Sequence, residues 1–387
     1  MAQRGLPVEA LVTSPTVVAP SAAAWTGLRV LVTGHTGFKG AWLVRWLRML
    51  GAEVHGLALD PPTQPSLFDG AGTGRLLASD HRVDLRDAAV VRRTLAEVSP
   101  AVVLHLAAQS LVRTSYREPA VTFATNVTGT ANLLDAVAAT PAADRPRAVL
   151  VVTSDKVYRP DGGRAHLEGD VLGGDDPYSA SKAMCEAVVT AFRHLPATDG
   201  RDAWDVPMAT ARAGNVIGGG DWADDRLVPD CIRALRSQRQ LDIRYPGAVR
   251  PWQHVLEPLS GYLLLAERLL EGAAAPEALN LGPGPGGEAT VAEIVDLVAR
   301  TWGGGSLRQE QDVAPAPENP ALRLDAGLAR AIGWRPRWTL GTAVEETVRW
   351  YRAHADGADE DALAGLMEEQ VARYVASPAL DAGEADR

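Results

Sequence analysis

The sequence predicts an α/β fold: a doubly wound parallel sheet covered by helices on both faces, followed by a smaller C-terminal lobe. Strand and helix patterns alternate from Leu28 to about Ala213, which is typical of such sheets. A glycine-rich turn joins the first apolar strand to the first helix. After Gly214 the strands become short, and Gly, Pro, Trp and Arg are frequent, as expected for a lobe that closes over a ligand.

The expected elements follow this alternation. The first strand starts at Leu28, and Phe38 to Leu50 is its crossover helix. Further strands are expected at Glu53–Leu59, near Val83, and at Ala101–His105, Ala148–Thr153 and Pro207–Arg212. Helices are expected between them at Asp87–Val98, Pro119–Ala139 and Pro177–Arg193, and in the second lobe at Val228–Arg239, Glu257–Glu271, Val291–Trp302 and Leu340–His354.

These elements divide the chain into four parts. We expect a flexible tail at 1–26, a dinucleotide-binding domain at 27–213, a mainly substrate-binding lobe at 214–355 with segments that return to the first domain, and a C-terminal helix with a frayed tail at 356–387. The first part is not expected to be a signal peptide, because Pro7, Pro15 and Pro20 interrupt its apolar core.

Composition narrows the functional classes. A chain of 387 residues with 46% hydrophobic content can bury a sizeable core. The net charge of -10 argues against an extended nucleic-acid surface. No run of about 18 apolar residues is present, so we expect no membrane span. Cys185 and Cys231 lack metal-ligand spacing, so we expect no metal site and a reducing, cytoplasmic setting.

The glycine-rich turn is the first candidate binding site. Gly34, Gly37 and Gly40 allow a dinucleotide pyrophosphate to approach the backbone and the helix N-terminus, which predicts a Rossmann-type domain. Asp60 ends the second strand, where its carboxylate can bind both ribose hydroxyls and would repel the extra phosphate of NADP. We therefore predict NAD as the cofactor, although Asp60 could instead cap the turn into Pro61.

Other candidate cofactor contacts follow the same strand ends, although small apolar residues there could equally be packing. The full set is Gly34, Thr36, Gly37, Phe38, Lys39, Gly40, Asp60, Asp84, Leu85, Leu106, Ala107, Ala108 and Gln109, together with Tyr178 and Lys182.

Tyr178 and Lys182 are the candidate chemical pair. Four residues apart on a helix, they lie on one face, with the ammonium beside the phenol. An adjacent positive charge favours the phenolate, so Tyr178 could act as the base in the oxidation of an alcohol. Two surface residues at helical spacing would give the same pattern, so the hypothesis depends on the rest of the chain.

Ser154, Tyr178 and Lys182 together resemble the catalytic residues of the short-chain dehydrogenase/reductase family, extended type. The resemblance covers the chain from Gly27 to about Trp350. Within that family, five stretches resemble the sugar-nucleotide 4,6-dehydratases, in particular those that act on CDP-glucose. The stretches span residues 34–43, 60–68, 105–116, 212–230 and 250–263, and the last two are long and specific.

The resemblance implies an NAD-dependent 4,6-dehydration of a nucleotide hexose, with CDP-glucose favoured and CDP-4-dehydro-6-deoxyglucose as the product. Tyr178 would deprotonate the 4-hydroxyl while hydride passes from carbon 4 to NAD, Ser154 would hydrogen bond the reacting oxygen, and Lys182 would hold the ribose. Water would then leave across carbons 5 and 6, and hydride would return to carbon 6. By analogy with related dehydratases, Asp155 would be the acid and Lys156 the base of the elimination, although the two could be a solvated turn pair.

Substrate recognition is expected from the turn after the fourth strand and from the second lobe. The candidates are Gln109, Ser110, Arg113, Asn126, Arg212, Asn215, Arg226, Arg250, Trp252 and His254. Arg226, Arg250 and His254 suit a diphosphate, and Trp252 could stack on the sugar or the base. The resemblance suggests that Asn126 contacts the cofactor-binding region. Each could instead be a salt bridge, a core aromatic residue or a satisfied core amide.

The segment 159–170 departs from the dehydratase pattern because it has no Phe, Trp or Tyr, so the hexose or nucleotide could differ. The alternatives are a dehydratase of another nucleotide sugar, a sugar-nucleotide 4-epimerase and, from another class, a non-catalytic NAD(P)-binding sensor. An epimerase needs no acid and base after the serine, and a sensor commonly lacks the Tyr-Lys pair. The resemblance also implies a homodimer or a dimer of dimers, paired through Pro119–Ala139 and Pro177–Arg193.

Overall fold

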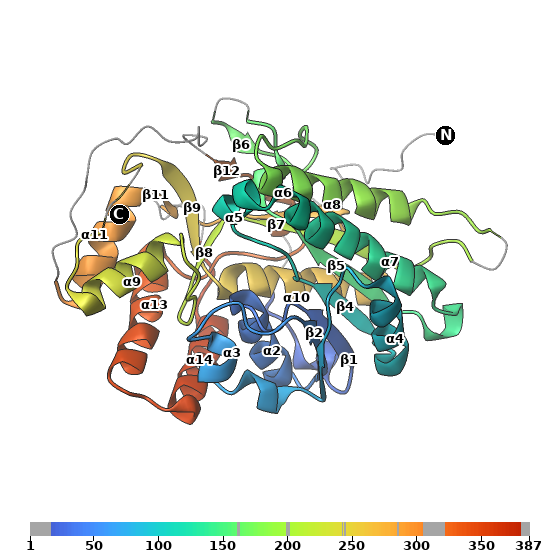
Figure 1. Cartoon of the computed structure of the whole chain (residues 1–387), viewed down its shortest axis with the longest axis horizontal. Helices are drawn as coiled ribbons and strands as arrows, with labels where there is room; N and C mark the ends of the chain where they lie inside the picture. Colours follow the sequence, from blue (N-terminus) through green and yellow to red (C-terminus); the bar gives the residue numbers. More distant parts are fainter. Residues whose placement is uncertain are drawn as a thin grey trace.

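The computed structural model describes residues 17–160, 163–198, 202–241, 243, 245–284, 286–304 and 322–380. Its centre is a sheet of seven strands: Arg29–Thr33 (β1), Glu53–Ala58 (β2), Ser79–Arg82 (β3), Val102–His105 (β4), Ala148–Val152 (β5), Met208–Ala213 (β7) and Ala278–Leu281 (β10). Their order is β10-β7-β5-β4-β1-β2-β3, and every neighbouring pair is parallel. Figure 1 labels β1, β2, β4, β5 and β7 of this sheet. The predicted doubly wound α/β fold is confirmed.

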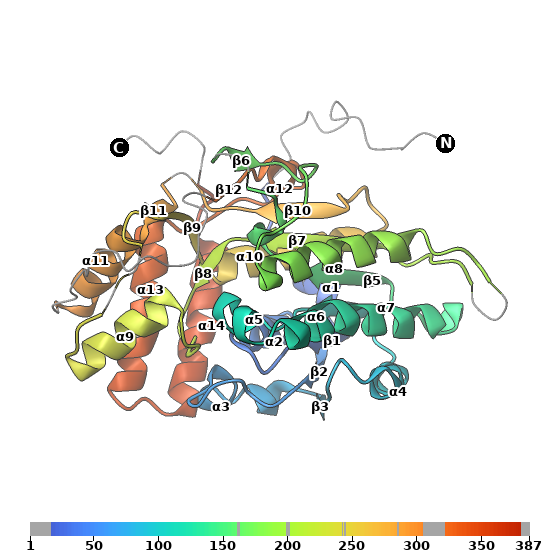
Figure 2. The same ribbon diagram turned by 45° about the horizontal axis from the view of Figure 1, so that its top comes forward.

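Helices cover both faces of this sheet (Figure 2). One layer contains α2 (Phe38–Met49) and α10 (Leu256–Leu270), and the other contains α4 (Ala88–Val98), α7 (Gly129–Ala139) and α8 (Pro177–Arg193). Alternate residues of β1 serve the two layers, because successive strand side chains point to opposite faces. Val30 and Val32 join the hydrophobic core beneath the first layer, whereas Leu31 joins the core beneath the second.

The helix expected over Pro119–Ala139 is continuous but not uniform. It begins as α6 (Pro119–Phe123), passes through a π-helical turn at Ala124–Thr128 (η3), and continues as α7. Asn126 lies in the π-helical turn, where the wider backbone often marks a functional region. The other predicted helices agree with the structure to within one or two residues at each end.

The second lobe contains a small mixed sheet and helices around it. Its strands are Asn215–Ile217 (β8), Val249–His254 (β9) and Glu288–Thr290 (β11), and its helices are Leu227–Ser237 (α9), Val291–Trp302 (α11) and Leu340–Ala355 (α13). As expected, part of this region returns to the first domain, since β10 pairs with β7 in the main sheet. The C-terminal helix is Glu360–Ala376 (α14), and residues 381–387 of the expected frayed tail lie outside the described residues.

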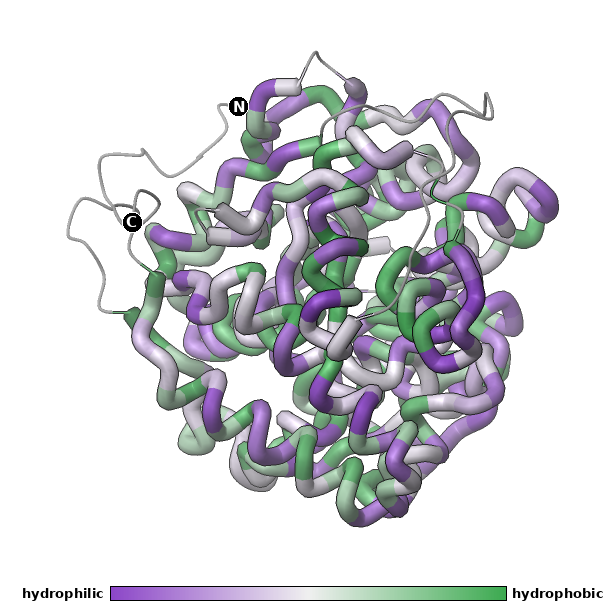
Figure 3. Tube along the Cα trace, turned by 90° about the vertical axis from the view of Figure 1, so that its left-hand side faces the viewer, coloured by the Kyte–Doolittle hydropathy of each residue, from purple (hydrophilic) through white to green (hydrophobic). Residues whose placement is uncertain are grey.

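Shorter elements complete the described chain. They are the helices Ala22–Trp25 (α1), Leu67–Gly70 (α3), Val112–Arg117 (α5) and Gly327–Ala331 (α12), the 3₁₀ turns Thr73–Leu76 (η2), Ala142–Asp144 (η4) and Asp155–Val157 (η5), and the paired strands Ala165–His166 (β6) and Arg323–Leu324 (β12). Hydrophobic and hydrophilic residues alternate along the outer helices in Figure 3, as expected for helices that bury one side.

The prediction of a flexible tail at 1–26 is wrong for residues 17–26, which pack against the body of the protein. Trp25 is fully buried, and its indole Nε1 donates a 2.6 Å hydrogen bond to Glu267. The Ser21 amide donates to the same carboxylate at 2.8 Å, and the Val18 amide donates to the Gly333 carbonyl at 3.2 Å. Residues 1–16 lie outside the described residues.

None of the helices in the described part of the chain combines the length and apolarity that crossing a bilayer requires. Over the same ranges, no three His, Cys, Asp or Glu side chains are grouped so as to hold a metal ion.

Candidate active site

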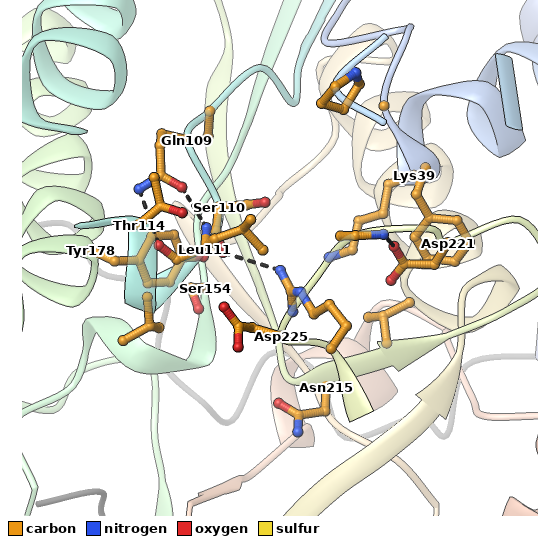
Figure 4. A pocket seen from close by; sticks show the side chains of 18 of the residues that line it. Lys39, Gln109, Ser110, Leu111, Thr114, Ser154, Tyr178, Asn215, Asp221 and Asp225 are labelled. Atoms are coloured by element: carbon orange, nitrogen blue, oxygen red, sulfur yellow. Dashed lines mark hydrogen bonds between the residues drawn. The ribbon is translucent and has the colours of Figure 1, made fainter. Parts of the chain in front are cut away.

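A cavity of about 1180 Å³ opens at the carboxyl ends of the sheet strands, between the sheet and the second lobe. Its walls come from the turns after β1, β2, β4, β5 and β7 and from the segment between β8 and α9. This is where ligands bind in open α/β sheets, because the strand order reverses there and the crossing loops leave a crevice. Figure 4 shows side chains from both lobes converging on this space.

The glycine-rich turn forms one end of the cavity. Gly34 has a φ of 76°, and a Cβ atom on it would lie 2.7 Å from the Ala107 amide nitrogen. A Cβ on Gly40 would lie 2.1 Å from the Gly34 carbonyl oxygen, so neither position accepts a side chain. Gly37 is the N-cap of α2 and offers no side-chain acceptor, which leaves the first amide groups of the helix for an anion. The turn therefore fits a dinucleotide pyrophosphate.

All of the residues expected to contact the cofactor line this one cavity. Asp60 follows β2, and its side chain is 89% exposed, so its carboxylate is available to ribose hydroxyls. Asp84 also lines the cavity but is paired with Arg86 at 2.6 Å. Leu106, Ala107 and Ala108 continue the wall after β4.

The five residues expected to be catalytic also line the cavity: Ser154, Asp155, Lys156, Tyr178 and Lys182. Ser154 caps the 3₁₀ turn after β5, since its hydroxyl accepts a hydrogen bond from the Lys156 amide at 3.1 Å. The Ser154 hydroxyl donates to Asp155 Oδ1 at 2.9 Å, and Lys156 Nζ donates to the same oxygen at 3.3 Å. Asp155 Oδ2 is buried and has no hydrogen-bond partner among the described residues.

Tyr178 lies in the first turn of the helix α8, whose N-cap Asp176 accepts a 2.9 Å hydrogen bond from the Ser179 amide. Burial raises the pKa of the Tyr178 phenol, and a hydrogen bond with Ser154 and the charge of Arg226 oppose that rise. Lys182 donates a 3.0 Å hydrogen bond to the Val152 carbonyl, and burial lowers its pKa.

The two side chains lie on one face of α8, and the ammonium of Lys182 reaches back to the end of β5. Near the phenol, the charge of Arg226 lowers the pKa of Tyr178, and the charges of Asp155 and Asp176 raise it. The effect of Lys182 on the Tyr178 pKa stays a prediction.

Seven of the ten candidate substrate contacts line the cavity: Gln109, Ser110, Arg113, Asn215, Arg226, Arg250 and Trp252. Arg226 donates to the Ser110 carbonyl at 3.1 Å, and Arg113 pairs with Asp225 at 2.8 Å. These contacts join the turn after β4 to the segment before α9. The remaining three candidates lie elsewhere.

Arg212 is not a cavity residue, and its assignment to the substrate is wrong. Its guanidinium forms a buried ion pair with Glu186, with Nε to Oε1 at 2.8 Å and Nη2 to Oε2 at 2.9 Å. Its Nη1 donates to the Tyr158 hydroxyl at 2.7 Å. Ala213 lines the cavity instead, because neighbouring residues of β7 point to opposite faces.

His254 and Asn126 are also buried rather than exposed to the cavity. His254 packs against Trp42 and Trp338, with ring centroids 5.8 Å and 4.8 Å away, so it is a core residue. Asn126 shapes the turn after β4: its Oδ1 accepts from the Gln109 amide at 2.8 Å, and its Nδ2 donates to the Gln109 carbonyl at 3.0 Å. It supports the cofactor end of the cavity from behind.

Several cavity residues were not predicted from the sequence, including Thr114, Asp221 and Asp225. Burial raises the pKa of Asp221, and the charges of Arg226 and other cations oppose that rise. All three lie inside the recognised stretches 105–116 and 212–230, but nothing in those stretches shows which side chains face the ligand.

The segment 159–170 approaches the cavity through Pro160, while Asp161 and Gly162 lie outside the described residues. His166 stacks on Tyr158, with ring centroids 4.5 Å apart, and Glu168 supplies a carbonyl to Arg212 at 2.9 Å. The segment 159–170 is thus held in place by contacts with Tyr158, which follows β5 and η5, and with Arg212 of β7.

A dinucleotide-binding turn and a Tyr-Lys helix around one cavity define an NAD-dependent enzyme of the Rossmann type. Residues 30–282 match the model of the NAD dependent epimerase/dehydratase family, and the chain belongs to that family. The cofactor is accordingly NAD.

Two curated relatives are sugar-nucleotide dehydratases. The chain is 45% identical over 341 residues to a CDP-glucose 4,6-dehydratase of Salmonella typhimurium, covering 87% of this chain and 93% of the relative. It is 30% identical over 347 residues to a dTDP-glucose 4,6-dehydratase of Xanthomonas campestris, covering 83% of this chain and 92% of the relative. A dTDP-glucose 4,6-dehydratase of Streptomyces venezuelae, solved with NAD bound, superposes with a TM-score of 0.70 at 27% identity, covering 85% of this chain and 98% of that chain.

Proposed function

We propose that this chain is an NAD-dependent hydro-lyase that converts CDP-glucose to CDP-4-dehydro-6-deoxyglucose and water. The carrying observation is the group formed by Ser154, Asp155 and Lys156 facing Tyr178 in one cavity. A simple dehydrogenase needs a base for one hydroxyl. A dehydratase also needs an acid and a base for the elimination, and Asp155 and Lys156 supply two further titratable groups. The 45% identity to a CDP-glucose 4,6-dehydratase supports the same reaction.

In the oxidation, Tyr178 accepts the proton of the sugar 4-hydroxyl. Ser154 hydrogen bonds the same oxygen, and its interaction with the Tyr178 hydroxyl supports this role. Bound NAD supplies the hydride acceptor for this step and the hydride donor for the last one. Residues 27–213 would hold it, with the pyrophosphate on the first turn of α2 and a ribose on Asp60, and residues 214–355 would mainly hold the nucleotide sugar.

In the elimination, Asp155 donates a proton to the departing 6-hydroxyl, and Lys156 removes the proton from carbon 5. We assign that proton to the Oδ2 atom of Asp155, because it has no hydrogen-bond partner within the described ranges. Lys156 bonds the other oxygen, so the acid and the base are held together after β5. The 4-ketone formed in the first step makes the carbon 5 proton acidic enough to leave.

One incubation tests this function. The protein is incubated with NAD and, in separate reactions, with CDP-glucose, dTDP-glucose and UDP-glucose, and each is read for the 4-keto chromophore in alkali. We expect the chromophore with CDP-glucose. A chromophore with only dTDP-glucose or UDP-glucose would show that the substrate is that nucleotide sugar and not CDP-glucose. A new 4-epimer without the chromophore would identify an epimerase. Nucleotide binding without any product would identify a sensor.

We also propose that two copies pair through α6, η3 and α8. Val121 and Met184 are 39% and 48% exposed on this surface, and an apolar hollow there is lined by Phe123, Ala124, Val127, Thr128 and Met184. A second copy would cover these side chains. Light scattering on the protein and on a Met184→Glu variant tests the pairing: a monomeric parent would refute it.

The two free, buried cysteines fit a proposed cytoplasmic location.

A further inference from the structure

Lys39 occupies the first turn of α2, the helix that receives the cofactor pyrophosphate. Resting on the proposed function, we propose that its ammonium group binds the diphosphate of the nucleotide sugar rather than that of NAD. Figure 4 shows the Lys39 side chain directed into the cavity, on the side opposite Tyr178 and Ser154. Lys39 would thus connect the cofactor-binding helix with the substrate.

Charged groups from the proposed catalytic site and from the second lobe act on the Lys39 ammonium. Those that act on it belong to Arg226, Asp155, Lys182 and Lys156, and three of these four groups are cations. Burial and the neighbouring cations together lower the pKa of Lys39 to about 8. Three of the four neighbours are proposed catalytic residues.

Lys39 differs from these cations in having no bonding partner. Within the described ranges, Lys182 donates to the Val152 carbonyl at 3.0 Å, Lys156 to Asp155 at 3.3 Å, and Arg226 to the Ser110 carbonyl at 3.1 Å. The described residues provide no hydrogen bond or ion pair for the Lys39 ammonium. Lys39 is partly buried and lines the cavity, so its ammonium is available to a negatively charged group that binds there.

The direction of the Lys39 side chain favours the diphosphate of the nucleotide sugar over the pyrophosphate of NAD. The backbone amides of the first turn of α2, left free by Gly37, already suit the cofactor pyrophosphate. The Lys39 side chain leads from that turn toward Arg226, which, like Arg250 and Trp252, belongs to the second lobe and lines the cavity. A diphosphate between Lys39 and Arg226 would neutralise both cations and hold the attached sugar near Tyr178.

Asp221 faces the same space and limits what can bind there. The charge of Lys39 is among those that oppose the burial-induced rise in the Asp221 pKa. The Asp221 carboxylate, beside the diphosphate position, would repel an anionic ligand whose charge the nearby cations did not balance. Removal of Lys39 should therefore weaken the binding of anionic ligands more than that of uncharged ones.

Binding of CDP and cytidine to the NAD-loaded protein tests the proposal, with isothermal titration calorimetry on the parent, Lys39→Met, Lys39→Arg and a surface control, Arg92→Met. We expect Lys39→Met to weaken CDP binding about 10- to 100-fold, the range for a charge-assisted hydrogen bond, and cytidine binding less than about 3-fold. Lys39→Arg should recover most of the loss, and Arg92→Met should show none.

The variants must also separate the two diphosphates. NAD affinity of the Lys39→Met protein should change less than about 3-fold. Unchanged CDP affinity, or a loss of NAD affinity with CDP affinity intact, would overturn the proposal. Thermal unfolding of each variant with NAD shows whether it is folded. If Lys39→Met is misfolded, the Lys39→Gln variant takes its place in the binding measurements and in the pH series below.

The pH dependence provides a readout that a structural role would not change. CDP binding to the parent protein should weaken as pH rises above about 8, because Lys39 loses its proton there, and the Lys39→Met protein should lose that step. The groups facing Lys39 are Arg226, Asp155, Lys182, Lys156 and Asp221, so the step is assigned only if Lys39→Met removes it. These measurements need no turnover. If the protein acted on another nucleotide sugar, the same test would use that nucleoside diphosphate.

Discussion

Arg212 and Glu186 form a two-pronged ion pair behind the catalytic helix, with nitrogen to oxygen distances of 2.8 Å and 2.9 Å. Glu186 lies one helical turn after Lys182, and it also accepts hydrogen bonds from the Thr153 and Thr210 hydroxyls at 2.5 Å and 2.7 Å. Thr153 directly precedes Ser154. The Glu186 carboxylate therefore joins the segment that carries the serine to the helix that carries the tyrosine and lysine, and the ion pair with Arg212 ties this helix to β7.

Replacing Arg212 by Met should reduce kcat at least about tenfold with little change in KM, because it disturbs the positions of Ser154 and Lys182 but touches no substrate. It should also lower the free energy of unfolding by about 3 to 5 kcal/mol, since it leaves Glu186 buried and unpaired. Steady-state kinetics and urea denaturation measure both effects. A raised KM at constant kcat would instead show that Arg212 contributes to substrate binding.

Replacing Asp155 by Asn should leave NAD binding unchanged and slow dehydration by about 100-fold or more, because the amide cannot donate the proton that the departing hydroxyl needs. The alkaline chromophore assay and an NAD titration measure the two effects. Asp224→Asn is the control, since that carboxylate is 92% exposed. Undiminished turnover by Asp155→Asn would refute its role as the acid.

Replacing Tyr178 by Phe should reduce turnover by about 100- to 10,000-fold while the fold is kept. In the parent protein, burial raises the pKa of Tyr178, so the phenolate is the minor form at neutral pH. Turnover should therefore rise as pH increases from about 6 to 9, because the fraction of phenolate rises with it. A flat pH-rate profile measured with saturating substrate would contradict this role.

Replacing Asp60 by Ser should shift cofactor preference toward NADP. Asp60 pairs weakly with Arg82 at 3.4 Å, while Asp80 holds the same guanidinium at 2.7 Å. Removal of Asp60 takes away the carboxylate that would repel a ribose phosphate and leaves the Arg82 Nη1 group to bind it. We expect the affinity for NADP to increase about tenfold and that for NAD to decrease, as measured by cofactor titration. The double variant with Arg82→Ala should lose the gain. No change in the ratio of the two affinities would show that Asp60 does not read the ribose.

Stability should fall between about pH 4.5 and 7 because of Glu257. Burial raises the pKa of Glu257 from 4.5 to about 7, while its carboxylate accepts hydrogen bonds from Tyr374 and from the Arg337 and Trp338 amides. A carboxyl group whose pKa is raised on folding contributes stability below its unfolded pKa, and the contribution is lost as pH rises through the folded value.

The Glu257→Gln variant should not show that loss. The difference between the free energies of unfolding of the variant and of the parent should therefore increase, in favour of the variant, by on the order of 3 kcal/mol between about pH 5 and pH 8. Urea denaturation of both proteins at the two pH values measures the difference. A constant difference would show that Glu257 does not titrate in this range.

The amino-acid sequence alone determined the order of strands and helices, because a period of two or of 3.6 residues is a property of neighbouring positions. The core strands β4 and β5 and the helix α8 lie within one residue of their predicted bounds at each end. That the turn glycines and Asp60 line the cavity could be predicted for the same reason: the carboxyl ends of the strands, where a dinucleotide binds, follow from that order. The π-helical turn within the predicted helix Pro119–Ala139 could not, since no local period indicates it.

Only the tertiary structure decided which polar side chains face the ligand. Arg212 and Ala213 are neighbours on β7, yet the first meets Glu186 in the core and the second lines the cavity. His254 lies in a recognised stretch, but two tryptophans from distant parts of the chain enclose it. Lys39 likewise shares the cavity with Arg226, 187 positions later along the chain. Such choices depend on packing between remote segments, which no local pattern of residues encodes.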